Sequence, residues 1–550
     1  MPRLTRSCLL LLSLALLLPV AASASPQDVQ QLAQKAAAAY AAKDYAASAD
    51  AWAAAIAAGG DDPVLYYNAA CASALAGRKD AALDLLGKAT AGGYNDLAAI
   101  RADADLLLLH DDARFESLLA GVARDAEARK RMWSNPAWKS AYQPTLDEDA
   151  RVAGLSRLWS EAKYNFANFD LVPELDLDRL YIEALPQVRA ATRTEDYYRV
   201  LRRFIAQLHD GHSSVRPPAE VANRLDAHPG LRTALVEGRV FVVGLLDPAL
   251  GALGLAPGME IVSVEGQPVR AWADARIAPY QPASTPQDRA SRTYERALLS
   301  GPVEEAAHVV VRDAGGRQRT LALPRMAARD YENAYWGGSV FEMRMLPGNI
   351  AYVRILHFGD SSAADGFREH FDEISRARGL VIDVRENGGG NSGEGYKILS
   401  MLTDRPFEGS RWKTREYVPA FRAWGRPEGV HAEAASTMQP DGKRHYAGPV
   451  LVLTSARTYS AAEDFVVAFD AMHRGRIVGE PTGGSTGQPL IFDLPGGGTA
   501  RVCTKRDAYP DGRDFVGVGI QPQVRAAPTV ADLRAGRDTV LDVAVALVGK

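Results

Sequence analysis

The sequence predicts a multidomain α+β protein with separate helical, β-rich and α/β parts. Residues 26–123 are rich in alanine and carry apolar side chains at helical spacing. Residues 340–545 instead alternate short apolar strands with amphipathic helices. The chain of 550 residues is long enough for about three or four domains. Its 47% hydrophobic and 24% charged residues are ordinary for a soluble globular protein.

The first 24 residues have the pattern of an export signal. Arg3 and Arg6 precede the apolar run 9–20, and residues 22–24 read Ala-Ser-Ala, which is typical of a cleavage site. The alternative is an uncleaved membrane anchor, but a span needs about 20 apolar residues and this run is shorter. We therefore expect an exported protein, periplasmic or secreted, with no stable membrane span.

Charge and cysteine content exclude several classes of function. The formal net charge is −4 and no basic run is present, so nucleic acid is not an expected partner. Cys8 lies in the signal, and Cys71 and Cys503 lie in distant segments, so we expect two buried thiols instead of a disulfide. No metal-ligand spacing accompanies them, and we expect neither a metal nor a cofactor.

Residues 25–125 contain two helical units offset by 34 residues, as Trp52 and Leu86 illustrate. Small residues that would let paired helices approach closely are Ala38, Ala55, Ala70 and Ala89. The pattern resembles the tetratricopeptide repeat. This resemblance implies either a docking surface for a protein partner or a structural appendage, and the sequence leaves both open.

Two blocks with different patterns follow the repeats. Residues 130–220 carry aromatic and aliphatic side chains spaced by three and four, which predicts a bundle of amphipathic helices ending near His212. Residues 225–326 predict strands, and their segment 254–269 resembles the core signature of a PDZ domain. That resemblance implies capture of a peptide C-terminus as an added strand, or a module that only braces the active site.

Residues 335–548 form the predicted α/β core. The expected strands are 349–355, 379–384, 448–453 and 476–479, with a helix over 363–378. In such sheets ligands gather beyond the carboxyl ends of the strands. The glycine-rich turn 387–390 and Ser460 both follow strands, so we expect them on one edge of the sheet.

Ser460 occupies the junction between the strand 448–453 and a helix whose apolar residues include Phe465 and Phe469. Backbone N–H groups at a helix start have no intrahelical partner. A serine placed there can attack a carbonyl while those amides stabilise the oxyanion. The alternative is that Ser460 only caps the helix.

Five motifs, in this order over about residues 130–545, resemble the S41 serine peptidases, the group of C-terminal-processing and tricorn-like enzymes. The motifs are Asp210-Gly-His212-Ser213, Asp383-Val-Arg385-Glu-Asn387-Gly-Gly389-Gly390, Ser460-Ala-Ala-Glu463, Val478-Gly479-Glu480-Pro-Thr482-Gly and Gly517-Val-Gly519-Ile520-Gln-Pro522. The resemblance implies a crotonase-like α/β protease core.

The resemblance also implies the catalytic residues. The processing branch uses a lysine after its Gly-Glu-x-Thr motif, but Ser485 stands at that place, so no Ser–Lys dyad is available. The tricorn-like branch uses a histidine, and His212 provides one with an ordinary pKa suited to a base near neutrality. His209 is the nearest rival. We assign Ser460 as nucleophile and His212 as base.

A third residue should orient the imidazole, and we choose Asp514 from the C-terminal part. For the oxyanion hole we expect the backbone amides of Ala461 and Gly389, where glycine permits close approach. Glu463 is interpreted as structural support on the helix.

The predicted function is an exported serine endopeptidase that cleaves proteins or peptides through an acyl-enzyme, with capture of substrate C-termini implied by the PDZ-like segment. One alternative is a non-catalytic adaptor that binds through the repeats and the PDZ-like module, and the missing lysine motivates it. A third hypothesis is a lipid or retinoid carrier built on the same core.

Overall fold

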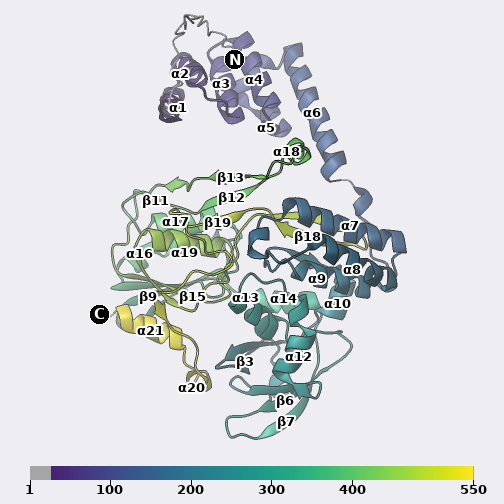
Figure 1. Cartoon of the computed structure of the whole chain (residues 1–550). Coiled ribbons are helices and arrows are strands. Elements are labelled where there is room, and N and C mark those ends of the chain that lie inside the picture. Colours follow the sequence, from purple (N-terminus) through teal and green to yellow (C-terminus); the bar gives the residue numbers. More distant parts are fainter. Residues whose placement is uncertain (1–25, 135, 549–550) are drawn as a thin grey trace, which may run out of the picture. The chain divides into compact units, whose positions relative to one another are not determined.

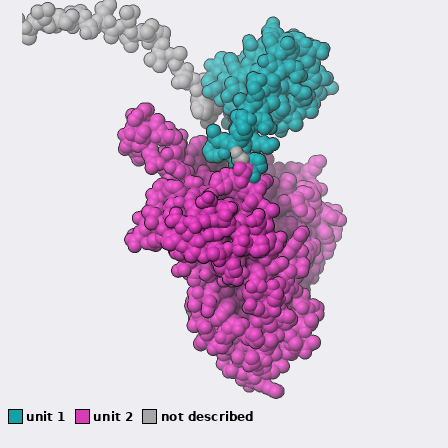
Figure 2. All heavy atoms as spheres, turned by 90° about the vertical axis from the view of Figure 1, so that its right-hand side faces the viewer, with its two compact units in different colours: residues 1–136 teal, residues 137–550 magenta. Residues whose placement is uncertain are grey.

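The computed structural model describes residues 26–134 and 136–548, so the expected export signal lies outside the described residues. The chain divides into two compact units, Met1–Pro136 and Ala137–Lys550 (Figure 2). No helix within the described ranges is both long and apolar enough to cross a bilayer.

The first unit is built from helices. They are α1 (Pro26–Ala41), α2 (Tyr45–Ala57), α3 (Pro63–Leu75), α4 (Lys79–Ala91), α5 (Leu97–Ala102), η1 (Ala104–Leu109) and α6 (Ala113–Trp133). Aspartates cap five of them, and each side chain accepts from a backbone amide of the first turn: Asp44, Asp62, Asp96, Asp103 and Asp112. The helical N-terminal region is thereby confirmed, while the tetratricopeptide assignment stays a prediction.

Small residues allow these helices to pack closely, as expected. Ala55, Ala70 and Ala89 are fully buried. Ala38 is exposed and Ala36 is buried in its place. The expectation for Ala38 was wrong because two residues along a helix turn a side chain about 200° around the axis, from the packed face to the solvent.

The second unit begins with a helical block, and Figure 1 shows these helices together with strand β18. After η2 (Pro136–Trp138), which begins at the last residue of the first unit, its elements are α7 (Glu148–Asn165), η3 (Phe169–Leu171), α8 (Leu177–Ala190), α9 (Thr194–Ala206) and α10 (Ala219–Leu225). A three-stranded sheet of order β1-β18-β17 completes its core, formed by β1 (Ser214–Arg216), β18 (Gly498–Cys503) and β17 (Pro489–Leu494). Leu155 and Tyr198 of the helices share one apolar cluster with Phe492 and Val502. The helical block therefore depends on strands that lie about 300 residues later.

A β-rich module follows, with strand order β2-β3-β4-β6-β7 and β5 paired to β4. The strands are β2 (Leu231–Val236), β3 (Arg239–Leu245), β4 (Glu260–Val264), β5 (Gln267–Pro268), β6 (Ala307–Arg312) and β7 (Gln318–Leu323). Its helices are α11 (Ala249–Ala252), α12 (Val269–Arg276), η4 (Ala278–Tyr280), α13 (Pro286–Ala290) and the π-helical turn η5 (Ser291–Arg296), and α14 (Ala328–Trp336) follows. Its assignment as a PDZ domain stays a prediction.

The α/β core holds a six-stranded sheet of order β20-β16-β15-β10-β9-β8. These are β20 (Val524–Arg525), β16 (Gly475–Gly479), β15 (Val450–Thr454), β10 (Gly379–Asp383), β9 (Ile350–Ile355) and β8 (Phe341–Leu346). Successive pairs are parallel except β8 with β9. Helices α15 (Ser362–Glu369), α16 (Phe371–Ser375), α17 (Ser392–Ser400) and α19 (Ala461–Ala471) cover one face, and α21 (Thr539–Val548) covers the other. Two-sided burial explains why the central strands are apolar throughout.

The remaining elements are short: β11 (Phe407–Glu408), β12 (Arg411–Glu416), α18 (Pro419–Ala423), β13 (Gly429–Glu433), β14 (Thr437–Met438), β19 (Arg506–Ala508) and α20 (Val530–Arg534). The single helix expected over residues 363–378 occurs as α15 and α16. It breaks at His370, where the backbone leaves the helical conformation and a ring nitrogen lies 2.9 Å from the carbonyl of Gly366. A mixed α/β protein with a helical N-terminal region and several sheets, as the sequence predicts, is thus confirmed.

Candidate active site

Ser460 lies at the turn between β15 and α19. Strands β10 and β15 run in parallel register, with Asp383 opposite Leu453, so the turns after both strands reach the same edge of the sheet, as expected. The backbone of Ser460 has φ 58° and ψ −127°, a region that non-glycine residues seldom occupy. Ser460 does occupy the N-cap position of α19, and the Glu463 carboxylate reaches back to its amide as in a capping box. An ordinary N-cap is extended, so the strained backbone of Ser460 is a feature that capping does not require.

The imidazole of His212 meets this hydroxyl. Its Nε2 lies 3.0 Å from Ser460 Oγ, although the two residues are 248 positions apart in the sequence. The Tyr459 ring stacks on the imidazole with centroids 5.3 Å apart. A Cβ at Gly211 would come within 1.6 Å of the Tyr459 hydroxyl oxygen, so the turn before His212 requires glycine. The sequence-predicted pair of Ser460 and His212 is brought together.

The other ring nitrogen has a hydroxyl partner. Ser485 Oγ lies 2.8 Å from His212 Nδ1, and Ser485 is fully buried. The carbonyl of Ser485 also accepts from the Ser460 amide at 3.1 Å. Ser485 thus contacts both members of the pair. It stands where the processing peptidases were expected to carry lysine, and that departure was the one signal in the sequence that could have identified it.

Glu463 holds the loop that carries Ser485. Its two carboxylate oxygens accept from the Thr482 hydroxyl at 2.5 Å and from the amides of Gly484 and Ser485 at 2.8 and 2.9 Å, and from the Ser460 amide at 3.3 Å. Burial raises the pKa of Glu463 to about 7, while these donors act in the opposite direction. Its position on α19 therefore ties the nucleophile turn to the Ser485 loop.

The surroundings of His212 keep its ring neutral. Burial lowers the pKa of His212 to about 3, and the nearby cations Arg501, Arg292 and Lys505 act in the same direction. A neutral imidazole can accept a proton from the serine hydroxyl. An imidazole nitrogen whose pKa is this low is also a weak base, so the site combines an available proton acceptor with a small driving force for proton transfer.

The glycine turn lies directly against Ser460. A Cβ at Gly389 (φ +100°) would meet Ser460 Cβ at 2.6 Å and the Ala461 amide nitrogen at 2.9 Å, so glycine is required there. The Gly389 amide itself donates to Asn387 Oδ1 at 2.9 Å. The expectation that this amide faces an oxyanion is therefore wrong in this structure: Gly389 permits close approach, and its N–H is engaged within the turn.

Asp514 does not join the pair. Its carboxylate lies 3.8 Å from Arg506 Nη1 and its side chain is 47% exposed, while its backbone forms an isolated bridge with Ala508. Because Ser485 occupies Nδ1 of His212, no place remains for Asp514 in orienting the ring. The choice of Asp514 as third residue is thus corrected to Ser485.

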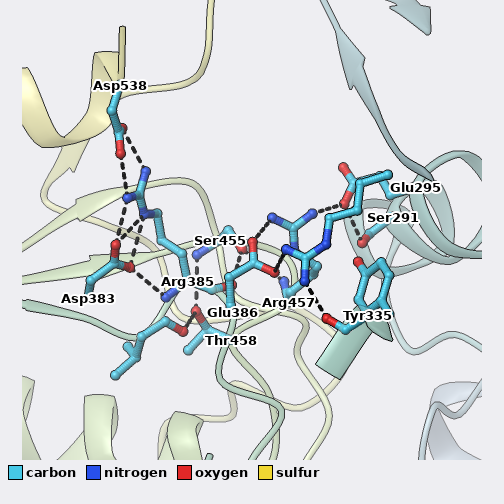
Figure 3. A network of polar contacts seen from close by, with 12 residues as sticks. Ser291, Glu295, Tyr335, Asp383, Arg385, Glu386, Ser455, Arg457, Thr458 and Asp538 are labelled. Atoms are coloured by element: carbon cyan, nitrogen blue, oxygen red, sulfur yellow. Dashed lines mark hydrogen bonds and ion pairs between the residues drawn. The ribbon is translucent and has the colours of Figure 1, made fainter. Parts of the chain in front are cut away.

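A network of ions supports the two turns (Figure 3). Arg385, two residues after β10, binds Asp383 at 2.6 Å and Asp538 at 2.7 Å. Arg457, three residues before Ser460, lies between Glu386 and Glu295 and contacts both carboxylates. The ion pairs of Arg457 therefore connect the glycine turn, the nucleophile turn and the β-rich module.

Two cavities open beside the serine hydroxyl. One, of about 500 Å³, is lined by His212, Tyr459 and Ser460 together with Gly388 and Gly390. The other, of about 320 Å³, is lined by Ser460 and Ala461 and also by Asp464 and Asp507. Burial raises the pKa of both of these aspartates. The nucleophile is therefore open to a ligand on both sides.

The cysteines lie outside this arrangement. Cys71 and Cys503 are buried free thiols, as expected. Among the described residues, the three possible metal ligands that lie within reach of one another are Cys71, Asp103 and Asp105 of the first unit. Tyr67 donates to Asp103 at 2.6 Å, and Tyr40 donates to Asp105 at 2.5 Å, so hydrogen bonds within the chain already engage these carboxylates.

Comparison with known proteins identifies the surrounding domain. Residues 349–526 match the model of peptidase family S41. The chain is 27% identical over 373 residues to the chloroplastic C-terminal processing peptidase of Tetradesmus obliquus, covering 64% of this chain and 72% of the relative. It is 25% identical over 403 residues to a tricorn protease homolog of Streptomyces coelicolor, covering 68% of this chain and 30% of that longer protein.

A solved structure shares the fold. Mature CPAF in complex with lactacystin aligns with a TM-score of 0.56 and 16% identity, over 73% of this chain and 98% of CPAF. At this level of identity the likeness concerns the fold alone. The Ser460 site lies within the matched residues 349–526, whereas His212 lies before them.

Proposed function

The chain belongs to peptidase family S41 through residues 349–526 and is therefore a serine-type peptidase, and from this premise we propose that it is an exported endopeptidase with Ser460 as nucleophile and His212 as general base. The observation that carries the assignment of residues is the 3.0 Å approach of His212 Nε2 to Ser460 Oγ. Hydroxyl attack at neutral pH needs such a base within hydrogen-bonding reach.

The proposed reaction has two halves. With its Nδ1 proton directed at Ser485 Oγ, the His212 ring presents Nε2 as acceptor and takes the Ser460 proton during attack on the peptide carbonyl. The imidazolium then gives this proton to the leaving amine, and an acyl-enzyme remains. Water, deprotonated by the same nitrogen, releases the acid product and restores the serine.

The developing oxyanion needs preorganised donors. The amide of Ala461, the first residue of α19, has no intrahelical acceptor by its position. Gly388 and Gly390 line the cavity beside Ser460, so their amides are the available donors of the glycine turn. We assign the oxyanion hole to Ala461 and this turn, with Gly389 providing the close approach.

The non-catalytic adaptor is less well supported. The missing lysine motivated it, and Ser485 now occupies that place as a partner of His212. For the substrate we infer proteins or peptides, in keeping with the peptidase family. Export rests on the N-terminal pattern of basic, apolar and small residues and agrees with the chloroplastic location named for the Tetradesmus obliquus relative.

A fluorophosphonate probe tests the assignment directly. We expect covalent labelling of the wild-type protein on Ser460, found by peptide mass spectrometry, and hydrolysis of casein. Ser460→Ala should abolish labelling and lower the rate by at least about 10⁴-fold, with an unchanged melting temperature. His212→Ala should do nearly the same. Equal casein hydrolysis by wild type and Ser460→Ala would contradict the proposal, and an unlabelled, inactive wild type would favour the adaptor.

A further inference from the structure

The cavity on the histidine side of Ser460 is strongly cationic in a chain that is acidic overall. Five arginines line it, namely Arg216, Arg292, Arg296, Arg457 and Arg501. Asp288 is the one carboxylate among the lining residues. The formal net charge of the chain is −4, so this concentration of positive charge is local.

Strand register explains how two of these arginines reach the cavity. In the pairing of β1 with β18, Ser214 is opposite Arg501 and Arg216 is opposite Thr499. Side chains two apart on a strand share a face, so Ser214, Arg216 and Arg501 lie on the same side of this small sheet. Val215 between them points into the apolar core.

The β-rich module contributes the next two. Arg292 and Arg296 are four residues apart in the π-helical turn η5, a spacing that places both on one side. The Arg292 guanidinium stacks over the Tyr459 ring at 5.2 Å, and that of Arg296 lies over Trp336 at 5.1 Å. Rings therefore hold both guanidinium groups in position at the cavity wall.

Two of the five arginines have carboxylate partners. Arg292 pairs with Asp288 at 2.6 Å, and Arg457 pairs with Glu295 and Glu386. Asp288 also accepts from the Tyr459 hydroxyl at 3.1 Å and from the Ser284 amide at 3.1 Å. The one carboxylate of the cavity wall, Asp288, is thus already engaged within the chain.

The other three arginines, Arg216, Arg296 and Arg501, form no ion pair with any carboxylate of the described chain. Arg501 donates to the Ser214 hydroxyl at 3.0 Å and to the Gly211 carbonyl at 3.4 Å, both of which are neutral acceptors. Burial lowers the pKa of Arg296 and of Arg501, and the charge of Arg292 lowers both further. The carboxylates of Asp210 and Asp288 act in the opposite direction on the pKa of Arg501 and of Arg296, so they compensate these charges in part without pairing with them. A bound anion would add counter-charge and offset the remaining repulsion among the arginines.

We propose that this cavity is a substrate subsite for a carboxylate, so that the enzyme prefers peptides carrying a negative charge beside the scissile bond. The guanidinium groups of Arg216, Arg296 and Arg501 are the recognising groups, since planar, forked donors bind carboxylates in pairs of hydrogen bonds. The carboxylate comes from an aspartate or glutamate side chain or from the chain terminus of the substrate. This inference rests on the proposed function, because it places a substrate at Ser460.

Four fluorescein-labelled, alanine-rich heptapeptides separate these sources. They carry a central glutamate or glutamine, and each has a free or an amidated C-terminus. Binding is measured by fluorescence anisotropy to the full-length Ser460→Ala chain, which does not turn the peptides over. If the cavity binds the glutamate side chain, we expect the amidated glutamate peptide to bind about tenfold more tightly than the amidated glutamine peptide. If instead amidation of the C-terminus alone lowers the affinity about tenfold, the bound carboxylate is that of the chain terminus.

Arginine variants then locate the recognition. Arg296→Gln and Arg216→Gln are each placed in the Ser460→Ala chain. Each should reduce the tenfold difference in affinity between the charged and the uncharged peptide to about threefold or less, whereas Arg405→Gln should leave this difference unchanged. Arg405 is a matched control because its side chain is 88% exposed. Equal affinity for all four peptides, or a preference that both cavity variants retain, overturns the proposal.

Cleavage of the same peptides by the wild type distinguishes the carboxylate subsite from the proposed peptidase mechanism. Binding that depends on the carboxylate, combined with no cleavage and no fluorophosphonate labelling, contradicts the peptidase mechanism and leaves the subsite standing. Labelling and casein hydrolysis without any charge preference contradicts the subsite alone.

Discussion

Two polar clusters adjoin the turn at Ser460, and they differ in whether their ionisable groups have partners of opposite charge. In the ion network, Arg385 and Arg457 each lie between two carboxylates. In the catalytic cluster, the His212 ring lies between two serine hydroxyls, with arginines beyond them. The first cluster pairs each cation with two carboxylates of the chain, and the second leaves an imidazole without any carboxylate partner.

This difference separates support from reactivity. Paired ions hold the turns at Glu386 and Arg457 in place, because moving either turn would leave a partly buried charge uncompensated. The imidazole must instead change its charge during the reaction. Hydroxyl partners fix the direction of its ring and leave its protonation to burial and to nearby cations.

Breaking the ion network should give the largest effect on stability. Arg457→Met removes the cation between Glu295 and Glu386, whose side chains are 17% and 23% exposed. We expect a loss of about 3–5 kcal/mol in the free energy of unfolding, measured by urea denaturation. The surface variant Arg405→Met should change it by less than about 0.5 kcal/mol. A loss below 1 kcal/mol would show that the network does not hold the turns.

Replacing the hydrogen-bond-accepting carboxyl group of Glu463 should disturb the catalytic cluster next most strongly. In Glu463→Gln the new amide group must face at least one backbone N–H that now donates to the carboxylate. We expect kcat to fall by about 10²–10³-fold because the Ser485 loop loses its anchor. Casein hydrolysis measures this, and Asp365→Gln, a surface acidic residue, is the control. Unaltered kcat would restrict Glu463 to folding.

Ser485 variants should change the pH profile. Since the pKa of His212 is lowered to about 3, its folded form stays neutral above that pH, and loss of kcat/KM through its protonation should begin well below pH 6.5. Ser485→Ala should lower kcat by about tenfold, whereas Ser485→Asp should move the acid limb upward by about one pH unit or more, because a carboxylate favours the imidazolium. An acid limb that stays in place in Ser485→Asp would contradict the contact with Nδ1.

The same lowered pKa affects stability. Between pH 3 and 6.5 the unfolded chain binds a proton at His212 that the folded chain does not, so this residue makes stability fall as the pH drops through that window. His212→Gln should flatten this part of the curve of unfolding free energy against pH. A curve of unchanged slope would show that the ring is accessible to protons in the folded protein.

The smallest effect is expected at Asp514. Its half-exposed carboxylate faces Arg506 at 3.8 Å and has no contact with His212. Asp514→Asn should therefore leave kcat/KM within about twofold of the wild type, because surface ion pairs contribute little. A loss above tenfold would restore Asp514 to the catalytic residues.

Local patterns in the sequence were sufficient for the central parts of the site. The strand before Ser460, the helix after it and the glycine turn follow from apolar periodicity and from glycine placement, which act over a few residues. His212 was found because a motif, Asp210-Gly-His212, points to one of ten histidines. The choice of Asp514 failed because it lies 302 positions after His212 in the chain (514 − 212). The residues around Asp514 carry no information on which side chain contacts so distant a ring.

The sequence by itself determined which residues could react and which segments are strands or helices, since these depend on side-chain chemistry and on near neighbours. Only the tertiary structure decided that Ser485 contacts the imidazole, that Glu463 anchors it, and that arginines from β1, β18 and η5 meet in one cavity. Those contacts join segments that are far apart in the chain. Which distant segments come into contact depends on how the whole chain packs, and local sequence patterns do not show this.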